Sequence, residues 1–247
     1  MLNKAKTLKG YKLNSLEGEI AKVKEFYFDD HYWTIRYLVA DTGSWLQDRQ
    51  VLISPYALAD VNKEEENITI NLTKSQIEGS PSAECDKPVS RQFEEAYYGY
   101  YGWPVYWDGP YTWGSYPSIE RDPQKWTEFT QVEEEWDPNL RSTYDVSGHD
   151  IQAIDGEIGY VKDFIIDDET WTIRYLIIDT GSWWPGKKVL VSPQWIERVS
   201  GSESKVFVNL LRETIKQSPE YTDESLLNRD YEIGLHKHYN RLGYWVD

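Results

Sequence analysis

The sequence predicts a mainly β protein made of two small β-barrels, related by internal duplication and carrying short helical turns and aromatic tails. The first observation behind this prediction is a repeat. A shift of 138 residues places the stretch from Gly18 on the stretch from Gly156 without a gap. The second is the string WTIRYL, which occurs at Trp33–Leu38 and again at Trp171–Leu176. The third is the series of short β-branched and aromatic runs between turn residues, which is typical of small barrels.

The repeat divides the chain into three segments. We expect a first barrel unit with its aromatic tail at 1–107 and a second barrel unit with its tail at 143–247. The segment 108–142 between them is acidic and contains glycine and proline, which is typical of a linker. Because this linker also contains tryptophans such as Trp113, we expect parts of it to pack against folded structure.

The first part of each repeat shows strand signals. Trp33–Val39 carries large residues on both faces, which predicts a strand that is buried on both sides or closed into a barrel. Upstream, the step from Val23 to Phe26 breaks the two-residue apolar period, which predicts a β-bulge. Asp29–Tyr32, which separates the two strands, is typical of a hairpin turn.

The second part of each repeat predicts shorter elements. Gly43 suits a loop that needs positive φ. Gln50–Ile53 and Ile68–Leu72 have the composition of strands. Thr73–Pro81 and Arg212–Pro219 each indicate one helical turn that ends at a proline.

Composition excludes several classes of partner. The formal net charge of −16 would repel a phosphate backbone or an anionic lipid surface, so we expect no nucleic acid partner. Met1–Lys6 lacks the apolar core of a signal peptide, and no run of about 18–20 apolar residues suggests direct membrane insertion. Cys85 is the single cysteine, which excludes an intramolecular disulfide. These features predict a soluble, cytoplasmic protein.

Each repeat contains an ordered series of glycines, acids and aromatic residues. In the first repeat the series is Gly18, Glu19, Val23, Phe26, Asp29, Asp30, Trp33, Arg36, Tyr37, Leu38, Asp41, Thr42, Gly43, Trp45, Val51, Leu52 and Pro55. This series resembles the PRC-barrel family. The second repeat matches better, with Gly159 where the first has Ala21, and with Trp183–Leu190. The tail at Lys87–Trp107 also resembles tandem PRC-barrel proteins of bacteria.

The resemblance implies a docking role. The family includes the cytoplasmic barrel of the H subunit of photosynthetic reaction centres and the barrel of a ribosome maturation factor, and both barrels dock on other proteins. We therefore expect a non-enzymatic adaptor with a protein partner, without a cofactor and without catalytic residues. An alternative is a regulator or assembly factor of a membrane electron-transfer complex. The sequence is also compatible with a homo-oligomer, because the two repeats can pack against each other within one chain or between chains.

Two sets of residues are candidates for contacts. Loops that combine tryptophan with glycine are typical interaction anchors, so we predict a partner surface at Asp41, Gly43, Trp45 and Leu46 and at Asp179, Gly181, Trp183 and Trp184. We expect each aromatic tail to fold over a barrel, either that of its own repeat or that of the other. The tail residues are Tyr101, Trp103, Tyr106 and Trp107, and Tyr239, Tyr244 and Trp245.

Two enzymatic or metal-binding alternatives follow from short motifs. The string Asp-Thr-Gly-Ser at Asp41 and at Asp179 also occurs in pepsin-like aspartic hydrolases, where two carboxylates share one proton. The opposing interpretation is that each aspartate braces its own loop. His236 and His238 have the spacing of a chelating pair, but Tyr98 and Tyr100 occupy these positions in the first repeat, which favours packing. We therefore expect no metal site.

Overall fold

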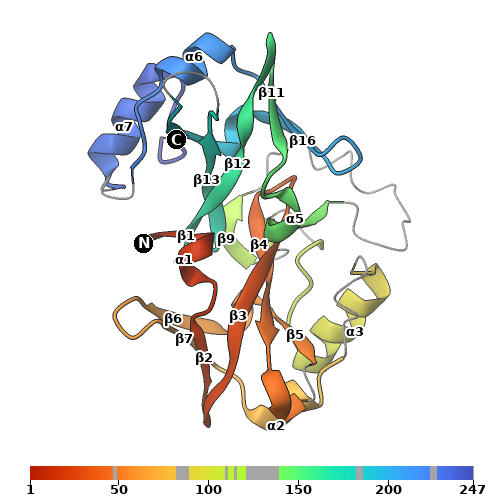
Figure 1. Ribbon diagram of the computed structural model, residues 1–247. Coiled ribbons are helices and arrows are strands. Elements are labelled where there is room, and N and C mark those ends of the chain that lie inside the picture. The colour runs from red at the N-terminus through yellow and green to blue at the C-terminus, as the bar shows by residue number, and fades with distance from the viewer. Residues whose placement is uncertain are drawn as a thin grey trace. The chain divides into compact units, whose positions relative to one another are not determined.

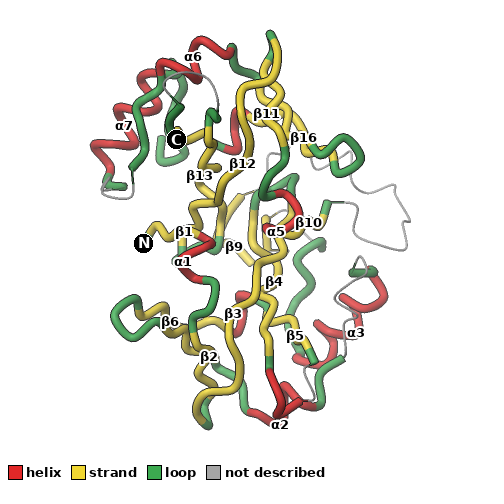
Figure 2. Tube along the Cα trace, viewed as in Figure 1, coloured by secondary structure: helices red, strands yellow, loops and turns green. Residues whose placement is uncertain are grey.

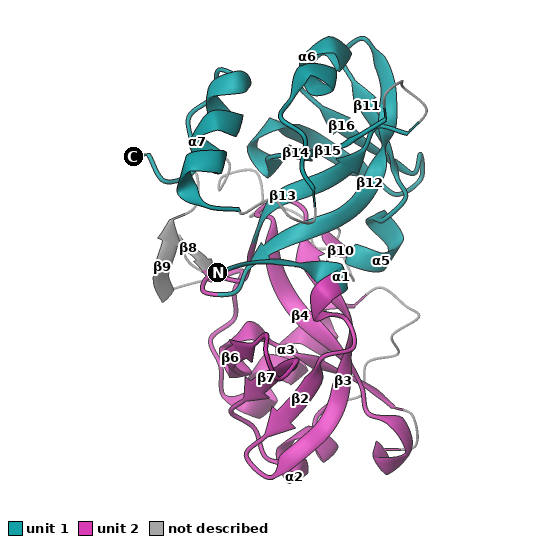
Figure 3. Ribbon diagram, turned by 60° about the vertical axis from the view of Figure 1, so that its left-hand side comes forward, with its two compact units in different colours: residues 1–6, 143–168, 173–247 teal, residues 7–142, 169–172 magenta. Residues whose placement is uncertain are grey.

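The computed structural model describes residues 1–46, 49–81, 89–108, 111–113, 116–120, 139–181, 186–222 and 227–246. Strands predominate and helices are few and short (Figures 1 and 2), so the prediction of a mainly β protein is confirmed. The chain forms two compact units, which are coloured separately in Figure 3. Unit 1 comprises Met1–Lys6, Thr143–Asp168 and Ile173–Asp247, and unit 2 comprises Thr7–Ser142 and Glu169–Thr172.

The elements of unit 2 belong largely to the first repeat. In chain order they are β2 (Lys12–Ser15), β3 (Gly18–Asp29), β4 (Thr34–Asp41), η1 (Gly43–Leu46), β5 (Gln50–Ile53), η2 (Pro55–Ala57), β6 (Leu58–Asn62), β7 (Asn67–Ile70), α2 (Lys74–Glu78), α3 (Arg91–Tyr101), β8 (Tyr111–Trp113), β9 (Tyr116–Glu120) and β10 (Leu140–Ser142). The short helix α1 (Ala5–Leu8) spans the boundary between the two units.

The elements of unit 1 follow the same order. They are β1 (Leu2–Lys4), α5 (Thr143–Val146), β11 (Asp150–Ala153), β12 (Gly156–Asp167), β13 (Thr172–Asp179), β14 (Lys188–Val191), η3 (Pro193–Trp195), β15 (Ile196–Ser200), β16 (Lys205–Val208), α6 (Arg212–Gln217) and α7 (Arg229–His238). The bounds of β11 to β16 lie 138 residues after those of β2 to β7, which is the offset of the sequence repeat.

Both units contain a mixed sheet with an open strand order. In unit 2 the order is β6-β7-β2-β3-β4-β5, in which β2 and β7 are parallel and the other neighbours are antiparallel. In unit 1 the order is β15-β16-β11-β12-β13-β14. Among the described residues no pairing joins β5 to β6 or β14 to β15. The sheets are therefore not closed, and the predicted barrel closure is not confirmed.

The local strand predictions agree with the structure of unit 2. Every residue of β4 from Thr34 to Ala40 is buried, as expected for a strand covered on both sides. The pairing of β3 with β4 shifts register between Val23 and Glu25, where the apolar period predicted a bulge. The helical turns before Pro81 and Pro219 form α2 and α6. The Thr73 side chain caps the start of α2, because its hydroxyl accepts a hydrogen bond from the backbone amide of Gln76 at 3.2 Å.

The helices α3 and α7 form where the sequence predicted only aromatic tails. Ser90 caps α3, since its hydroxyl accepts a hydrogen bond from the Phe93 amide at 3.2 Å, and Gly102 ends the helix with φ of 67°. Asn228 caps α7 in the same way through the Tyr231 amide at 2.9 Å. Polar caps at both starts therefore supply acceptors for backbone N–H groups that have no partner within the helix.

Each unit also contains a short strand from the other half of the sequence. The strand β1 pairs antiparallel with β12, and β10 pairs antiparallel with β3. The paired residues are Leu2 with Asp167, Asn3 with Ile166 and Lys4 with Ile165, and Leu140 with Asp29, Arg141 with Phe28 and Ser142 with Tyr27. No sequence pattern indicates this exchange, because a three-residue strand carries no periodicity.

The glycine that distinguishes the second repeat has a structural reason. Gly159 has φ of +106°, and a Cβ there would lie 2.1 Å from the Asp179 carbonyl oxygen. The first repeat has Ala21 at this position, and it is buried. The close approach of two backbones in unit 1 therefore requires glycine.

In the part of the chain that the structure describes, no helix has both the length and the apolar character needed to cross a bilayer.

Candidate functional site

The predicted interaction loops begin with compact turns that the aspartates brace. A carboxylate oxygen of Asp41 accepts a hydrogen bond from the Gly43 amide at 3.0 Å, and Asp179 accepts one from Gly181 at the same distance. Both glycines have positive φ, 54° and 60°. Each aspartate thus makes the backbone contact that the bracing interpretation predicts. Neither bond involves a second carboxylate, whereas the aspartates of an aspartic hydrolase act as a pair.

The first of these loops combines exposure with rigid attachment. The Trp45 side chain is 36% exposed, and its indole nitrogen donates to the Ile20 carbonyl oxygen. Leu46, which ends η1, is half-buried. The Thr42 hydroxyl binds the Arg49 carbonyl oxygen. The corresponding Trp183 and Trp184 lie outside the described residues.

A shallow pocket lies beside the second loop, within unit 1. Its volume is about 380 Å³. The described residues that line it are Asp179, Gly181, Gly186, Lys187, Lys188, Glu220, Tyr221 and Thr222. The Lys187 ammonium donates to the Ser218 carbonyl oxygen, so this cation already has a protein partner. The lining carries two acids and two lysines, which suits a charged surface contact better than a small apolar ligand.

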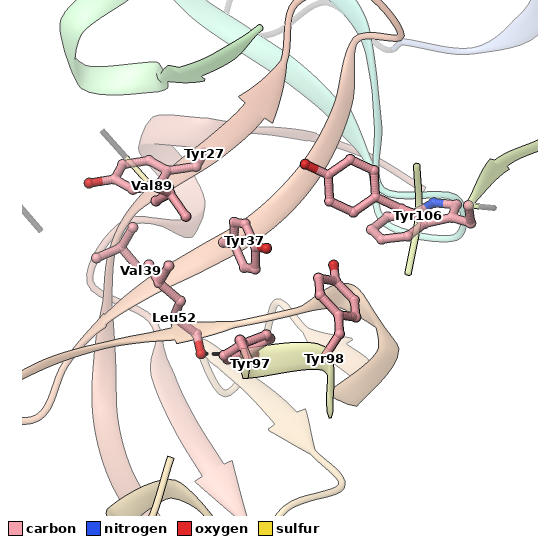
Figure 4. Close-up of a cluster of buried hydrophobic side chains, with 9 residues drawn as sticks. Tyr27, Tyr37, Val39, Leu52, Val89, Tyr97, Tyr98 and Tyr106 are labelled. Atoms are coloured by element: carbon pink, nitrogen blue, oxygen red, sulfur yellow. Dashed lines mark hydrogen bonds between the residues drawn. The ribbon is translucent and has the colours of Figure 1, made fainter. Parts of the chain in front are cut away.

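The first aromatic tail packs onto the sheet of its own unit. Figure 4 shows Tyr37 of β4 lying among Tyr97, Tyr98 and Tyr106. The Tyr97 hydroxyl donates to the Leu52 carbonyl oxygen at 3.0 Å. The buried members of this cluster are Tyr27, Tyr37, Val39, Leu52, Val89, Tyr97, Tyr98, Tyr106 and Trp113, and Tyr101, Trp103 and Trp107 pack against it partly buried. The tail is thus part of the core of unit 2.

A buried carboxylate lies at the centre of this packing. Glu94 of α3 has no solvent exposure. One of its oxygens accepts hydrogen bonds from the Tyr37 hydroxyl at 2.8 Å and the Tyr106 hydroxyl at 2.7 Å. The other lies 2.9 Å from the Arg91 guanidinium. We call Glu94, Tyr37, Tyr106 and Arg91 the carboxylate cluster of unit 2.

Unit 1 contains the same arrangement. Glu232 of α7 is 3% exposed and accepts from the Tyr175 hydroxyl at 2.9 Å and the Tyr244 hydroxyl at 2.8 Å. The Arg229 guanidinium lies 3.2 Å from its second oxygen. Each of these residues is 138 positions after its counterpart in unit 2. We call Glu232, Tyr175, Tyr244 and Arg229 the carboxylate cluster of unit 1.

A second arginine covers the tail tyrosine in each unit. In unit 2 the Arg36 guanidinium lies 3.9 Å from the centre of the Tyr106 ring and 2.8 Å from the Asp29 carboxylate. In unit 1 Arg174 lies 4.1 Å from the Tyr244 ring and 2.8 Å from Asp167. A cation over an aromatic face attracts the ring, so each pair helps to hold its tail.

The electrostatics of the clusters keep the tyrosines neutral. Burial, together with the adjacent Glu94 carboxylate, raises the pKa of Tyr37 well above its ordinary value. Burial and Glu232 do the same for the pKa of Tyr175. A neutral hydroxyl can donate to the carboxylate, whereas a phenolate would repel it. In each cluster both hydroxyls donate to one carboxylate oxygen and the arginine pairs with the other, so the clusters join the helix, the tail and the sheet of each unit.

Unit 1 differs from unit 2 at one position beside its cluster. His236 replaces Tyr98 and is 2% exposed. Its Nε2 lies 3.1 Å from the Tyr175 hydroxyl, and its Nδ1 lies 2.9 Å from the Leu242 carbonyl oxygen. A proton on Nδ1 lets His236 donate to the Leu242 carbonyl oxygen. The Tyr175 hydroxyl has a single proton, which it donates to Glu232, so its contact with Nε2 is not a second donated hydrogen bond. Burial lowers the pKa of His236, which favours this neutral ring.

The histidine pair has separate partners. His238 Nε2 lies 2.8 Å from the Thr214 carbonyl oxygen, whereas His236 contacts Tyr175 and Leu242. Tyr239 is buried, and Trp245 is half-buried with its ring 5.0 Å from that of His236. Within the described residues no group of three or more histidine, cysteine or acidic side chains has an arrangement that could hold a metal ion.

Sequence reasoning missed the clusters, although a signal was present. Arg91 and Glu94 in the first repeat match Arg229 and Glu232 in the second, and a charged pair three residues apart suits one face of a helix. Acidic residues in a hairpin turn such as Asp29–Tyr32 are usually solvated. Asp29 is instead buried against Arg36, which shows that the turn is part of the core.

Comparison with known proteins identifies a domain in the second half of the chain. The PRC-barrel domain model matches residues 138–215. A protein of Deinococcus radiodurans, described as an uncharacterized protein, is 36% identical over 84 residues. That match covers 34% of this chain and 30% of the relative's length. Neither description names an enzymatic activity.

Proposed function

We propose that the chain is a tandem PRC-barrel protein that acts in the cytoplasm as a non-enzymatic adaptor and docks on a protein partner. The matched domain covers the second repeat up to residue 215, and three facts support a first copy. The strands of unit 2 have the repeat offset, the carboxylate cluster recurs residue for residue, and both aspartate turns have the same bracing bonds. Internal duplication explains all three.

One observation carries the docking proposal. The Gly43–Leu46 turn presents Trp45 at the surface, while the Trp45 indole donates to the Ile20 carbonyl oxygen and the Asp41 carboxylate accepts from the Gly43 amide within the turn. A turn that already has such hydrogen bonds loses less entropy on binding than one without them, which favours recognition of a partner surface. The pocket beside Asp179 gives the second loop a neighbouring concave surface.

The buried charges favour an adaptor over an enzyme. Glu94 and Glu232 use both oxygens within the protein, and Asp41 and Asp179 each accept from their own turn. An acid–base catalyst needs a group that can reach a substrate proton. The hydrogen bonds and ion pairs of these four carboxylates described above are all with groups of the protein itself, which supports a structural role for them.

The test is site-specific photo-crosslinking in cells of the source organism, with soluble and membrane fractions separated. A crosslinking residue replaces Ser44 in the predicted surface, and the matched control replaces Glu64 in the exposed turn between β6 and β7. We expect one protein to be captured from position 44 and not from position 64. Capture from both positions alike, or from neither, contradicts the docking proposal. A captured partner from the membrane fraction would identify the adaptor as one that serves a membrane complex.

A further inference from the structure

The exchanged strands β1 and β10 occupy edges that the neighbouring strands leave open. The strand β2 pairs with β3 only over Gly18–Lys22, so the later part of β3 needs another partner on that side. The strand β10 supplies it at Tyr27–Asp29. In unit 1, β11 pairs with Gly156–Tyr160 of β12, and β1 covers 165–167. We call β1 and β10 the docking strands, and 27–29 and 165–167 the acceptor edges.

These edges are apolar and cannot remain uncovered. Phe28 in one edge, and Ile165 and Ile166 in the other, have no solvent exposure. A bare edge with unpaired backbone groups next to such side chains is prone to pair with another chain. Each edge therefore has a strong requirement for an added strand.

Acidic residues fix the docking strands at matching positions. The Arg141 guanidinium lies 2.9 Å from the Asp30 carboxylate, and the Asn3 side chain donates to Asp168 at 2.7 Å. The terminal ammonium of Met1 also pairs with Asp168. A second pair of matching acids adds contacts: Glu25 accepts from the Ser142 hydroxyl, and Asp163 accepts from the Lys6 amide, just after β1, at 3.2 Å. The acids of each unit thus hold a docking strand that comes from the other half of the chain.

We propose that each acceptor edge recognises the docking strand from the other half of the chain as a separable binding element, so that the two halves of this chain associate without a covalent link. The partner for each edge is an extended segment that enters antiparallel and places a donor opposite the second aspartate of the turn. In one chain the linker keeps this partner at high local concentration. This inference is independent of the adaptor role.

The experiment uses the full chain with a protease site inserted between Glu120 and Asn139 and with an affinity tag at the C-terminus, which leaves Met1 free. After complete cleavage, size-exclusion chromatography and native mass spectrometry measure whether the halves stay together at micromolar concentration. We expect a 1:1 complex. Separation of the cleaved halves would overturn the proposal.

A charge variant shows which surface holds the complex. Asn3→Asp and Arg141→Asp together place a carboxylate opposite Asp168 and Asp30. Loss of these contacts should weaken association of the cut halves by at least about tenfold. Adding Asp30→Arg and Asp168→Asn restores opposite or neutral pairs and should restore association. Circular dichroism of the uncut variants shows that they fold. Unchanged association of the charge variant would contradict the proposal, because another surface would then hold the halves, and so would a failure of the rescue in a folded protein.

Discussion

The two carboxylate clusters share their residues and bonds but differ in exposure. In unit 2 Arg36 is completely buried, and the Arg91 side chain is 29% exposed. In unit 1 the Arg174 and Arg229 side chains are 18% and 48% exposed. Trp113 of the linker adds to the core of unit 2 and lies 4.8 Å from the Arg36 guanidinium. Similar hydrogen bonds should therefore contribute differently to the free energy of unfolding, because water screens the charges of the unit 1 cluster more than those of the unit 2 cluster.

The largest effect is expected from removing the buried carboxylate of unit 2. Glu94→Ala leaves Tyr37, Tyr106 and Arg91 without their common acceptor, which should cost about 3–5 kcal/mol in the free energy of unfolding. Denaturant unfolding measures this loss. Glu232→Ala is the matched variant in the more exposed cluster and should cost less. Equal losses, or a larger loss in unit 1, would contradict the comparison.

A smaller loss is expected at the glycine that only the second repeat has. Gly159→Ala forces an alanine into positive φ against the Asp179 carbonyl, which should cost about 2–4 kcal/mol in the free energy of unfolding. Ala21→Gly tests the same position in unit 2 and should cost about 1 kcal/mol or less. Thermal and denaturant unfolding of both variants measure the difference. A tolerated alanine at 159 would show that the two repeats have the same backbone there.

Acid should weaken unit 1 more than unit 2. The folded state holds His236 neutral with a lowered pKa, so the unfolded chain binds the extra proton more readily. The stability that this residue contributes is complete above its ordinary pKa of 6.5 and falls as the pH drops through the lower folded value. Amide hydrogen exchange of α7, followed as the pH decreases with the intrinsic rates corrected, measures the change.

Exchanging the two residues tests this assignment. His236→Tyr, which installs the residue of unit 2, should remove the acid sensitivity of α7. Tyr98→His should create a similar sensitivity in α3. If the pH profile of α7 is the same in His236→Tyr, another group is responsible.

The smallest effect concerns alkaline titration. Burial, together with Glu232, raises the pKa of Tyr244 to about 12, and the pKa of Tyr37 also lies well above its ordinary value. The neutral hydroxyls stabilise the fold below the ordinary pKa of 10.0, and this stability is lost as the pH rises through the folded values. Ultraviolet absorbance of the phenolate, compared between Tyr244→Phe and Tyr37→Phe, should show a titrating group near pH 12 missing in the first variant. Titration of Tyr244 near pH 10 would contradict its place in the cluster.

Much of the fold could be predicted from the sequence, because strands of β-branched and aromatic residues have a local signature. The buried strand at Thr34–Ala40, the bulge after Val23 and the helical turns before Pro81 and Pro219 depend on neighbouring residues. The exchange of β1 and β10 depends on contacts between residues far apart in sequence, which no local pattern encodes.

The clusters were harder to predict for a similar reason. Glu94 looks like an exposed helix residue, and only its contacts with Tyr37 and Tyr106 explain why it is buried. His236 was expected to pack because a tyrosine occupies its place in the first repeat, and it is buried beside Tyr175. The docking role of the predicted interaction loops stays a prediction, because it depends on a partner rather than on the fold of this chain.

The central claim is that a buried carboxylate fixes each aromatic tail to the sheet of its own unit. Amide hydrogen exchange of Glu94→Gln, a variant that keeps the size of the side chain, tests it most directly. Protection should fall across α3 at Arg91–Tyr101 and at Tyr106, while α7 keeps the protection of the natural protein. Unchanged protection of α3 and Tyr106 would contradict the claim, because the tail would then be held without the carboxylate.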